Sequence, residues 1–421
     1  MMIFATRSHG MRTEEQIKTI KDLGIIGGGA AGLFAACFAK ERGLSFEVLE
    51  KTGSCGSKLL LTGGGRCNIL NLKTPMELKS CYHGKDNFIY PALAHYPPQK
   101  AYAFIEKVLG VDLIEEENNR IFPASGKSRQ ILDALLGYTG SENIRSKTSV
   151  TKLLREEESG IWQVTADTGD VFCYRNIILA AGGMSYPKTG SSGESYKLAK
   201  DLGHKIVPPV AALAPVKIRA RDEIGVPAGL TVKSCIVKIL DGDKTLRKTE
   251  GDVLFTHEGL SGPAVMELAR DIREGVKISI DLAPVLEDKH LTRDIAASPA
   301  RRFTNILSSY IPQSLADHIV TASGASQYIN ASEVTKDIRR KALRMIRGFT
   351  VEALSDPDIR TAYVTAGGVD ISSVDRKTMG SKICPGLYFA GEFLDFDGIS
   401  GGYNLTACIA QARLAVDSVR I

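Results

Sequence analysis

The sequence predicts an α/β protein in which one domain, built on a parallel sheet, is interrupted by a long insertion. Three observations support this fold class. A strand, glycine turn, helix and strand follow one another after residue 20, and a second strand, turn and helix follow residue 384. Residues from about 193 to 350 fit neither pattern. At 421 residues the chain is also longer than one ordinary core requires, which is typical of two or three domains.

The first pattern is the stretch LGIIGGGAAGLFAACFAKERGLSFEVLEK at residues 23–51, in which a short apolar strand leads into Gly27-x-Gly29-x-x-Gly32. Glycines at these positions permit a sharp turn, let the backbone approach a pyrophosphate and let the helix pack against the sheet. The N-terminus of that helix offers free N–H groups to phosphates. Glu50, which closes the second strand, is placed to accept the ribose hydroxyls. The stretch therefore predicts a dinucleotide site.

The second pattern is CPGLYFAGEFLDFDGISGGYNLTACIAQARLAV at residues 384–416. Leu387–Ala390 is expected to be a strand, Gly391 and Glu392 break it, and SGGYN at 400–404 opens another helix. An extended two-part ligand needs such an anchor, because a carboxylate can hold a sugar-alcohol chain and a helix N-terminus can face an electron-accepting ring. The pairing of the two anchors favours FAD over NAD.

Motifs distributed along the chain carry a family resemblance. The N-terminal GxGxxG together with GLYFAGE resembles the glutathione-reductase-type FAD fold. KLLLTGGGRCN, ILAAGG, YPKTGSSGESYKLAKDLGH, THEGLSGPA, AYVTAGGV, TMGSK and GEFLDFDGISGGYNL occur in that order, and together they resemble the bacterial aminoacetone-oxidase-like flavoproteins, including bile-acid-reductase-like members. The resemblance covers roughly residues 23–418. It implies a Rossmann domain in which the late acid binds the ribityl chain of a non-covalent FAD and the last helix points at the flavin.

The loop LLLTGGGRCN at residues 59–68 is expected to cross back over the FAD, with its glycines against the pyrophosphate and the flavin edge. Cys67 is expected to be a small buried cysteine beside the flavin. It is not expected to be a redox thiol, because the nearest preceding cysteine, Cys55, is twelve positions away. The residues expected to contact FAD are Gly27, Gly29, Ala30, Ala31, Gly32, Glu50, Lys51, Lys58, Leu59, Thr62, Gly63, Gly64, Arg66, Cys67, Asn68, Val150, Ala181, Gly182, Gly391, Glu392, Gly401, Gly402, Tyr403, Asn404 and Leu405.

The sequence between the two anchors predicts an inserted domain that covers the substrate. Alternation over 206–284 is typical of strands, and 286–348 has helical periodicity. An insertion between two halves of a cofactor domain can cover a substrate. The predicted parts are an N-terminal extension (1–20), the first part of the FAD-binding domain (21–192), a β-rich substrate domain (193–285), a helical subdomain (286–350) and the second part of the FAD-binding domain (351–421). Candidates for catalytic residues are His257, Glu258, Arg66 and Tyr403.

Composition argues against nucleic acid, membranes and metal ions as partners of this protein. The formal net charge of +5 is small for this length, so we expect no nucleic-acid partner. No signal peptide or apolar run of about eighteen residues is recognisable, which predicts a cytoplasmic protein that does not enter a membrane. The eight cysteines form no CxxC pair, so we expect reduced thiols and no metal site. The sequence leaves the oligomeric state open.

The expected function is that of an FAD-dependent oxidoreductase, with hydride passing between a small organic substrate and flavin N5. The resemblance allows two variants, which are an aminoacetone-oxidase-like enzyme that uses O2 and a reductase of unsaturated carbonyl compounds fed by NAD(P)H. No second strand-linked GxGxxG occurs, so any nicotinamide is expected to dock transiently. Two alternatives stay open, an FAD-binding tRNA-modifying protein and a flavin-binding protein without catalysis.

Overall fold

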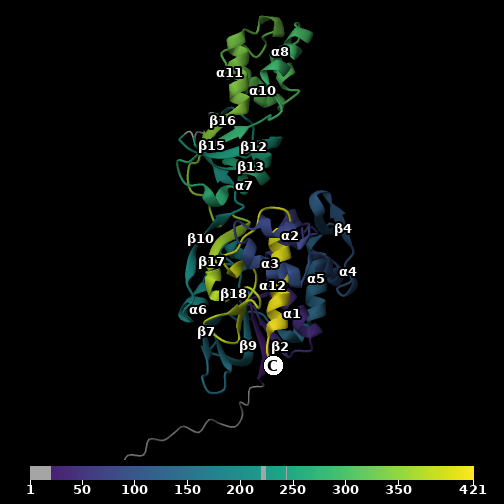
Figure 1. The fold of residues 1–421 in the computed structure, drawn as a ribbon, viewed down its shortest axis with the longest axis vertical. Helices are drawn as coiled ribbons and strands as arrows, with labels where there is room; N and C mark the ends of the chain where they lie inside the picture. The colour runs from purple at the N-terminus through teal and green to yellow at the C-terminus, as the bar shows by residue number, and fades with distance from the viewer. Residues whose placement is uncertain (1–19, 220–223, 243) are drawn as a thin grey trace, which may run out of the picture.

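The computed structural model describes residues 20–219, 224–242 and 244–421, and it arranges them as two bodies stacked along the long axis (Figure 1). Residues 1–19 of the predicted extension (1–20) lie outside the described residues. The lower body contains both chain anchors, and the upper body contains the insertion. The predicted α/β class, with a Rossmann-type domain interrupted by an insertion, is confirmed.

The lower body is built on a nine-stranded mixed sheet whose centre is parallel. The first strand, β1, lies between β2 and β9 and runs parallel to both. The strand β20 is parallel to β9 on the far side, so the two anchors of the sequence meet in one sheet. The strands of this sheet are β1 (Lys21–Ile26), β2 (Phe46–Leu49), β6 (Ile144–Arg145), β7 (Val150–Arg155), β8 (Trp162–Ala166), β9 (Val171–Leu179), β18 (Val374–Asp375), β19 (Gly380–Ser381) and β20 (Leu387–Phe389).

Two helices begin at the anchors and pack against each other. They are α1 (Ala30–Glu41) and α12 (Tyr403–Ser418), which lie side by side in Figure 1. All nine residues of α1 from Ala31 to Ala39 are buried. Further helices and a small antiparallel sheet enclose the pair: α2 (Pro75–Leu78), α3 (Asp86–His95), α4 (Pro98–Lys107), α5 (Ser128–Thr139), β3 (Leu70–Asn71), β4 (Leu113–Glu116) and β5 (Arg120–Pro123).

The upper body is a six-stranded antiparallel sheet with helices beyond it, and it has a hydrophobic core of its own. Alternating burial along β12 places one face of the sheet on that core. Its elements are β11 (Val216–Lys217), β12 (Thr231–Asp241), β13 (Lys244–Phe255), β14 (Gly259–Ser261), α7 (Pro263–Met266), β15 (Lys277–Asp281), α8 (Asp288–Ala297), α9 (Phe303–Leu307), α10 (Gln313–Ala322), α11 (Lys336–Arg347) and β16 (Phe349–Glu352).

The structure moves both predicted boundaries of the insertion. The helix α6 (Tyr196–Asp201) packs into the lower core, so the core of the insertion begins at Val216 and not at residue 193. The strand β16 pairs with β15, so residues 349–352 belong to the upper sheet, where the sequence suggested the end of a helical subdomain and the return to the FAD domain. Both differences depend on long-range pairing that local periodicity does not reveal.

An antiparallel ribbon connects the two bodies. The chain leaves the lower body after β10 (Ile206–Ala212) and returns along β17 (Val364–Val369), and these two strands pair with each other. Figure 1 shows them side by side below the upper sheet. Within the described part of the chain, no helix combines the length and the hydropathy required to span a bilayer.

Candidate cofactor and active site

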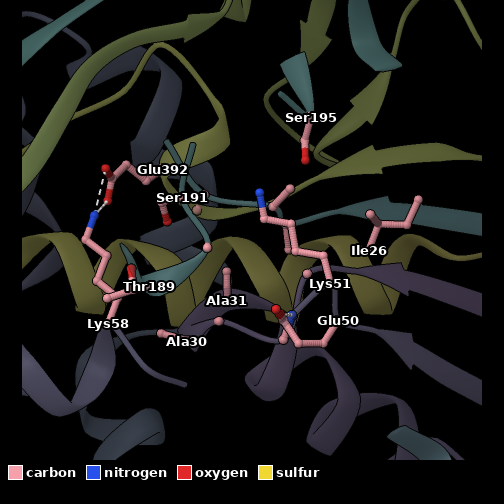
Figure 2. A pocket seen from close by; sticks show the side chains of 18 of the residues that line it. Ile26, Ala30, Ala31, Glu50, Lys51, Lys58, Thr189, Ser191, Ser195 and Glu392 are labelled. Atoms are coloured by element: carbon pink, nitrogen blue, oxygen red, sulfur yellow. Dashed lines mark hydrogen bonds and ion pairs between the residues drawn. The ribbon is translucent and has the colours of Figure 1, made fainter. Parts of the chain in front are cut away.

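An elongated cavity of about 510 Å³ lies at the carboxyl ends of the parallel strands. The ends of β1, β2, β9 and β20 open into it, and so do the first turns of α1 and α12. In open α/β sheets, ligands bind outside the carboxyl ends of strands, at the point where the connections change sides. Figure 2 shows Glu50 and Lys51 at one end of the cavity and the pair Lys58–Glu392 at the other. The cavity therefore suits an extended ligand that is held at both ends.

Two glycines of the first turn have different roles: Gly29 faces the ligand space, and Gly32 lets α1 pack against the turn. An added Cβ at Gly29 would meet no atom of the described residues within 4 Å, so this glycine faces open space. An added Cβ at Gly32 would lie 1.9 Å from the Gly27 carbonyl oxygen, so Gly32 lets α1 pack against the turn and does not itself line the cavity. No side chain of the described residues caps the N-terminus of α1. Its free N–H groups are available for a pyrophosphate.

Glu50 is held at the glycine turn by three donors. Its Oε2 accepts the Gly28 N–H at 2.8 Å, and its Oε1 accepts the N–H and hydroxyl of Thr52 at 2.8 and 2.7 Å. Oε2 accepts one hydrogen bond among the described residues, so it keeps one further acceptor site for a ligand. The neighbouring Lys51 donates to Ser192 at 2.7 Å, which draws the loop before α6 over this end of the cavity.

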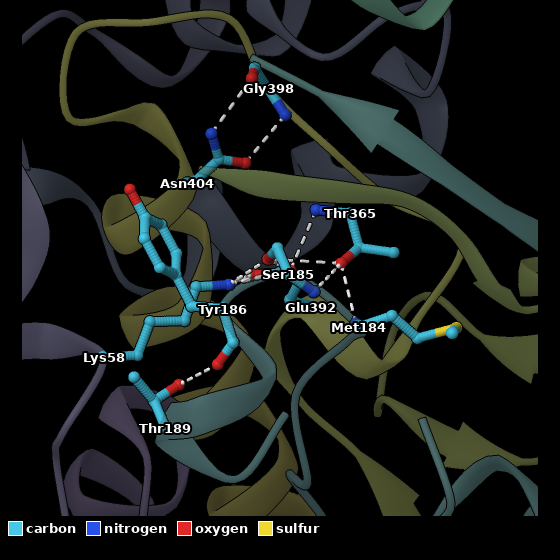
Figure 3. Close-up of polar contacts among 9 residues, drawn as sticks. All are labelled: Lys58, Met184, Ser185, Tyr186, Thr189, Thr365, Glu392, Gly398 and Asn404. Carbon is cyan, nitrogen blue, oxygen red and sulfur yellow. Dashed lines mark hydrogen bonds and ion pairs between the residues drawn. The ribbon is translucent and has the colours of Figure 1, made fainter. Parts of the chain in front are cut away.

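The opposite end contains a neutralised carboxylate. Glu392 accepts from the Lys58 ammonium at 2.7 and 2.9 Å, from the Ser185 hydroxyl at 2.9 Å and from the Thr365 N–H at 2.9 Å (Figure 3). Thr365 belongs to β17, so the ribbon to the insertion contacts the site directly. Because the charge of Glu392 is paired, a sugar-alcohol chain can donate to it without first ordering the carboxylate.

Gln411 gives the sharpest indication that a ligand is required. The residue is fully buried in α12 and lines the cavity. Its Oε1 accepts the Gly391 N–H at 2.8 Å, whereas its Nε2 has no partner among the described residues. A buried unsatisfied amide costs about 1–3 kcal/mol. A ligand acceptor at this position removes that cost, and together with the open face of Gly29 it shows that the residues present fit an FAD.

The glycine loop at residues 59–68 plays a different part from the one predicted. Leu59 and Thr62 line the cavity, but Gly63 and Gly64 are exposed. Their φ angles of +57° and +65° explain the requirement for glycine. The Asn68 amide, in the orientation that satisfies both of its ends, accepts the Gly402 N–H at 3.1 Å. The first part of the loop, at Leu59 and Thr62, thus lines the ligand space, whereas residues 63–68 do not line it and Asn68 positions the start of α12.

Arg66 and Cys67 are corrections to the predicted site. Arg66 forms a surface ion pair with Glu116 and lies 4.3 Å from the Phe122 ring centroid. Cys67 is buried, and burial raises the pKa of its thiol to about 11. Neither residue lines the cavity. The sequence placed them beside the FAD because their loop was expected to cross it, and it gave no sign that Glu116 would attract the arginine to the surface.

Tyr403, His257 and Glu258 are also outside the cavity as the described residues form it. The hydroxyl of Tyr403, which is buried, accepts from Lys73 at 2.9 Å, so it serves the packing of α12. His257 and Glu258 are exposed on the turn between β13 and β14, and Glu258 pairs with Lys217 at 2.8 Å. None of the four predicted catalytic candidates therefore reaches the ligand space in this structure.

The residues predicted to contact FAD fall into two groups, those that line the cavity and those that do not. Those that line the cavity are Gly27, Gly29, Ala30, Ala31, Glu50, Lys51, Lys58, Leu59, Thr62, Val150, Ala181, Gly182, Gly391, Glu392, Asn404 and Leu405. Those that do not are Gly32, Gly63, Gly64, Arg66, Cys67, Asn68, Gly401, Gly402 and Tyr403. Asn404 also closes the turn before α12 by exchanging two hydrogen bonds with Gly398 (Figure 3).

Several lining residues were missed by sequence reasoning. Thr189–Ser191 and Ser195 line the cavity, although none of them is among the residues expected to contact FAD. The glycines of this stretch gave a signal that the chain approaches a ligand closely. Tyr363, Phe396 and Gln411 also line the cavity, and no local pattern marks them. Across the described ranges, no cluster of three or more His, Cys, Asp or Glu residues could hold a metal ion.

A mixed sheet with a two-anchored cavity at its carboxyl edge defines a Rossmann-type dinucleotide-binding flavoprotein fold. The description "HI0933-like protein Rossmann domain" matches residues 21–418, and the chain belongs to this family. A relative from Haemophilus influenzae named ribosomal RNA dihydrouridine synthase is 30% identical over 391 residues, covering 90% of this chain and 94% of the relative. A relative from Clostridium scindens named 3-dehydro-bile acid delta(4,6)-reductase is 30% identical over 411 residues, covering 93% and 97%.

Among solved structures, a 3-ketosteroid-delta4-(5alpha)-dehydrogenase from Rhodococcus jostii RHA1 is similar over 97% of this chain and 98% of its own, with 14% identity and a TM-score of 0.47. The family, its relatives and the cavity together make this protein an FAD-dependent oxidoreductase.

Proposed function

We propose that this protein reduces a carbon–carbon double bond conjugated to a carbonyl group, with NAD(P)H as the source of electrons. The observation that carries the proposal is the reaction shared by the two relatives' names. Dihydrouridine is uridine whose 5,6 double bond, which is conjugated to a carbonyl group, has been reduced. A delta(4,6)-reductase of 3-dehydro bile acids acts on double bonds conjugated to a ketone. The two names differ in substrate size but agree in chemistry.

The residues of the cavity supply position and charge for this reaction. FAD, when bound, supplies hydride at flavin N5. The free N–H groups at the start of α1 hold the pyrophosphate, Glu50 accepts from the ribose, and Glu392 accepts from the ribityl chain. Gln411 finds its missing acceptor on the ligand. Tyr363 lines the cavity and is 44% exposed, so the opening beside it is the proposed place where the substrate reaches the ring.

The reductase variant is favoured over the aminoacetone-oxidase-like variant. Both relatives are named for adding hydrogen to a double bond. Within the described part there is also one glycine-rich nucleotide turn on a parallel strand and no second one for a nicotinamide domain. Nicotinamide and substrate are therefore proposed to use the same opening in turn.

A second candidate concerns the molecule that carries the double bond. The Haemophilus influenzae relative is named for ribosomal RNA and is matched over nearly its whole length, so a uridine within an RNA is the alternative to a small enone. The small net charge of +5 favours a small molecule, because binding RNA requires neutralisation of several phosphates. Retention of RNA that falls steeply with added salt supports the RNA alternative, and its absence supports the small molecule.

Anaerobic stopped-flow spectroscopy tests the reaction. We expect NADH or NADPH to bleach the flavin absorbance, and 2-cyclohexen-1-one to restore it with formation of cyclohexanone. Reoxidation by air alone, with no response to either nicotinamide, contradicts the reductase and supports the oxidase variant. Supplying a uridine-containing RNA in place of the enone separates the two candidate substrates.

A further inference from the structure

A compound with a conjugated double bond is flat where it reacts. The carbon–carbon double bond, the carbonyl group and the atoms attached to them lie in one plane, because the π electrons extend over all of them. A site that distinguishes such a compound from a saturated one therefore benefits from a flat, apolar surface, which an aromatic side chain provides. Two aromatic residues, Tyr363 and Phe396, are among the described residues that line the cavity.

Of these two rings, that of Tyr363 is accessible to a ligand. Phe396 is buried, and its ring stacks on Tyr82 with centroids 4.8 Å apart and lies 6.1 Å from that of Phe88. The Phe396 ring therefore packs within the core of the FAD-binding body. Tyr363 lines the cavity as well but is 44% exposed, so a molecule that enters the cavity from solvent can reach its side chain.

The backbone fixes Tyr363 close to Glu392, the carboxylate that is proposed to hold the ribityl chain. The Tyr363 N–H donates to the Leu213 carbonyl at 3.0 Å, which extends the pairing of β10 and β17 by one residue. Two residues further along the chain, the Thr365 N–H donates to Glu392 at 2.9 Å (Figure 3). A strand rises about 3.3 Å per residue, so Tyr363 lies about 7 Å from Thr365 on the side of the insertion.

A second tyrosine keeps the Tyr363 ring in place. The rings of Tyr186 and Tyr363 meet edge to face, with centroids 5.7 Å apart and planes at 85°. Ser185, which precedes Tyr186, donates to Glu392 at 2.9 Å, and its own N–H donates to the Thr365 hydroxyl at 3.0 Å. Figure 3 shows the Tyr186 ring projecting from this turn. Because both rings are tied to the same anchor, the Tyr363 side chain loses little freedom when a ligand packs against it.

The insertion reaches the same place on the ribbon. Met266 of α7 packs against a small apolar cluster that consists of Ala212, Leu213, Val364 and Ala366. Leu213 bonds to the backbone of Tyr363, and Val364 follows Tyr363 in the chain. Tyr363 therefore lies where the insertion meets the FAD-binding body, and binding sites are common at such junctions between domains.

We propose that Tyr363 determines the substrate specificity of this site, by packing its ring against the plane of a cyclic conjugated carbonyl compound. The proposal rests on the reductase function above and names the feature that its substrate must have, a flat ring whose double bond is conjugated to a carbonyl group. A cyclic enone and the base of a uridine both have this feature. Reduction makes two carbons of the ring tetrahedral, so the product puckers and loses contact with Tyr363. The contact thus favours binding of the substrate over retention of the product.

A pair of ketones tests the preference for a flat ring without any turnover. Acetophenone and cyclohexyl methyl ketone carry the same methyl ketone on a flat and on a puckered six-membered ring. Binding of each ketone to the oxidised, FAD-loaded protein is followed through the change in flavin absorbance. We expect the wild type to bind acetophenone with a Kd about 3- to 10-fold lower than that for cyclohexyl methyl ketone, as a ring–ring contact provides.

Three variants assign the preference to one side chain. Tyr363→Leu should remove it, because an apolar side chain remains but the flat ring is lost, whereas Tyr363→Phe should keep it. The matched control is Tyr328→Leu, whose tyrosine is exposed on the insertion, and it should also keep the preference. The Kd for FAD should be the same in all three variants. A preference that survives in Tyr363→Leu, or a wild type that binds both ketones equally or not at all, overturns the inference.

The kinetics of the reduced protein separate binding from chemistry. Each protein is reduced with NADPH or NADH and mixed anaerobically with increasing concentrations of 2-cyclohexen-1-one. We expect Tyr363→Leu to raise the half-saturating concentration about 3- to 10-fold and to leave the limiting rate of flavin reoxidation unchanged. A lower limiting rate at an unchanged half-saturating concentration overturns the specificity role.

The two measurements also distinguish this inference from the proposed function. If the wild type is reoxidised by the enone and Tyr363→Leu behaves like the control, the inference alone fails. If the reduced wild type reacts with no conjugated carbonyl compound, the proposed function fails, whereas the comparison of the two ketones still decides whether Tyr363 binds a flat ring. A weaker Kd for FAD in Tyr363→Leu, with the ketone preference retained, makes Tyr363 a cofactor contact and also overturns the inference.

Discussion

Lys58 and Glu392 are separated by 334 positions in the chain, yet the Lys58 Nζ lies 2.7 Å from the Glu392 Oε2 inside the cavity. Lys58 follows β2, the second strand of the first anchor, and Glu392 follows β20, the strand of the second anchor. Their ion pair therefore joins the two halves of the FAD-binding domain across the whole insertion. Both side chains are about one-fifth exposed, so the pair is partly desolvated and its two members depend on each other.

Removal of the Glu392 carboxylate should weaken FAD binding. We expect Glu392→Ala to lower the affinity by about 1–3 kcal/mol, because a charged acceptor is lost and the Lys58 ammonium is left unpaired. The Kd is measured by the change in flavin fluorescence when apoprotein is titrated with FAD. The double variant Lys58→Met/Glu392→Ala should recover part of the loss, as expected for coupled residues. An unchanged Kd for Glu392→Ala contradicts a ribityl-binding role.

Two glycines of the first turn should respond differently to a side chain. Gly29→Val should abolish retention of FAD and leave the thermal stability of the apoprotein intact, because its Cβ meets open space. Gly32→Val should destabilise the apoprotein itself, because its Cβ would lie 1.9 Å from the Gly27 carbonyl. The ratio of flavin to protein absorbance and the Tm of the apoprotein report the two effects. A fully loaded Gly29→Val protein, from which heating releases the usual FAD, shows that the turn does not hold the pyrophosphate.

The thiol of Cys67 should be inert. Burial raises its pKa to about 11, so at neutral pH it is neither a nucleophile nor an electron donor to the flavin. We expect Cys67→Ala to keep the flavin spectrum and most of the turnover, and we expect wild-type Cys67 to resist iodoacetamide at pH 8. A long-wavelength charge-transfer band in the reduced wild type that disappears in Cys67→Ala would contradict this expectation.

The interface between the two bodies should respond to pH in two opposite ways. Burial raises the pKa of Asp397 to about 6, although Arg270 of the insertion donates to it at 2.6 Å. Its contribution to the free energy of unfolding is present below about pH 4 and is lost as the pH rises through 6. Burial lowers the pKa of the nearby His83 to about 4, so its contribution is present above about pH 6.5 and is lost as the pH falls through 4.

Asp397→Asn should therefore remove a loss of stability on raising the pH from 4 to 6, and His83→Gln should remove a loss on lowering it across the same window. Urea denaturation of each variant at a series of pH values checks the two slopes. Slopes that change in the same direction for both variants contradict this assignment.

Local motifs predicted the parts of the site that depend on local geometry. The turn at Gly27 and Gly29 follows its strand directly, and Glu392 follows β20 in the same way, so spacing alone places them at one edge of a sheet. Arg66 was assigned wrongly because its partner, Glu116, lies on a strand 50 positions away. Tyr403 was assigned wrongly because its hydroxyl accepts from Lys73, which lies 330 positions away in the chain. Gln411 was not singled out at all, since its buried amide has one end without a partner among the described residues only once the chain is folded, and no local pattern marks it.

The ribbon of β10 and β17 has a consequence for how this architecture can change. The chain enters the insertion along β10 and leaves it along β17, and these two strands pair side by side. The residues between Ala212 and Val364 are therefore joined covalently to the lower body through this two-stranded ribbon. Replacing that segment with a shorter or longer one, or with a tight hairpin, leaves the order of the nine-stranded sheet unaltered. The insertion can therefore be exchanged as a unit. Related proteins that share the flavin chemistry can change their substrate by exchanging the insertion at the paired strands β10 and β17, while the FAD-binding body stays the same.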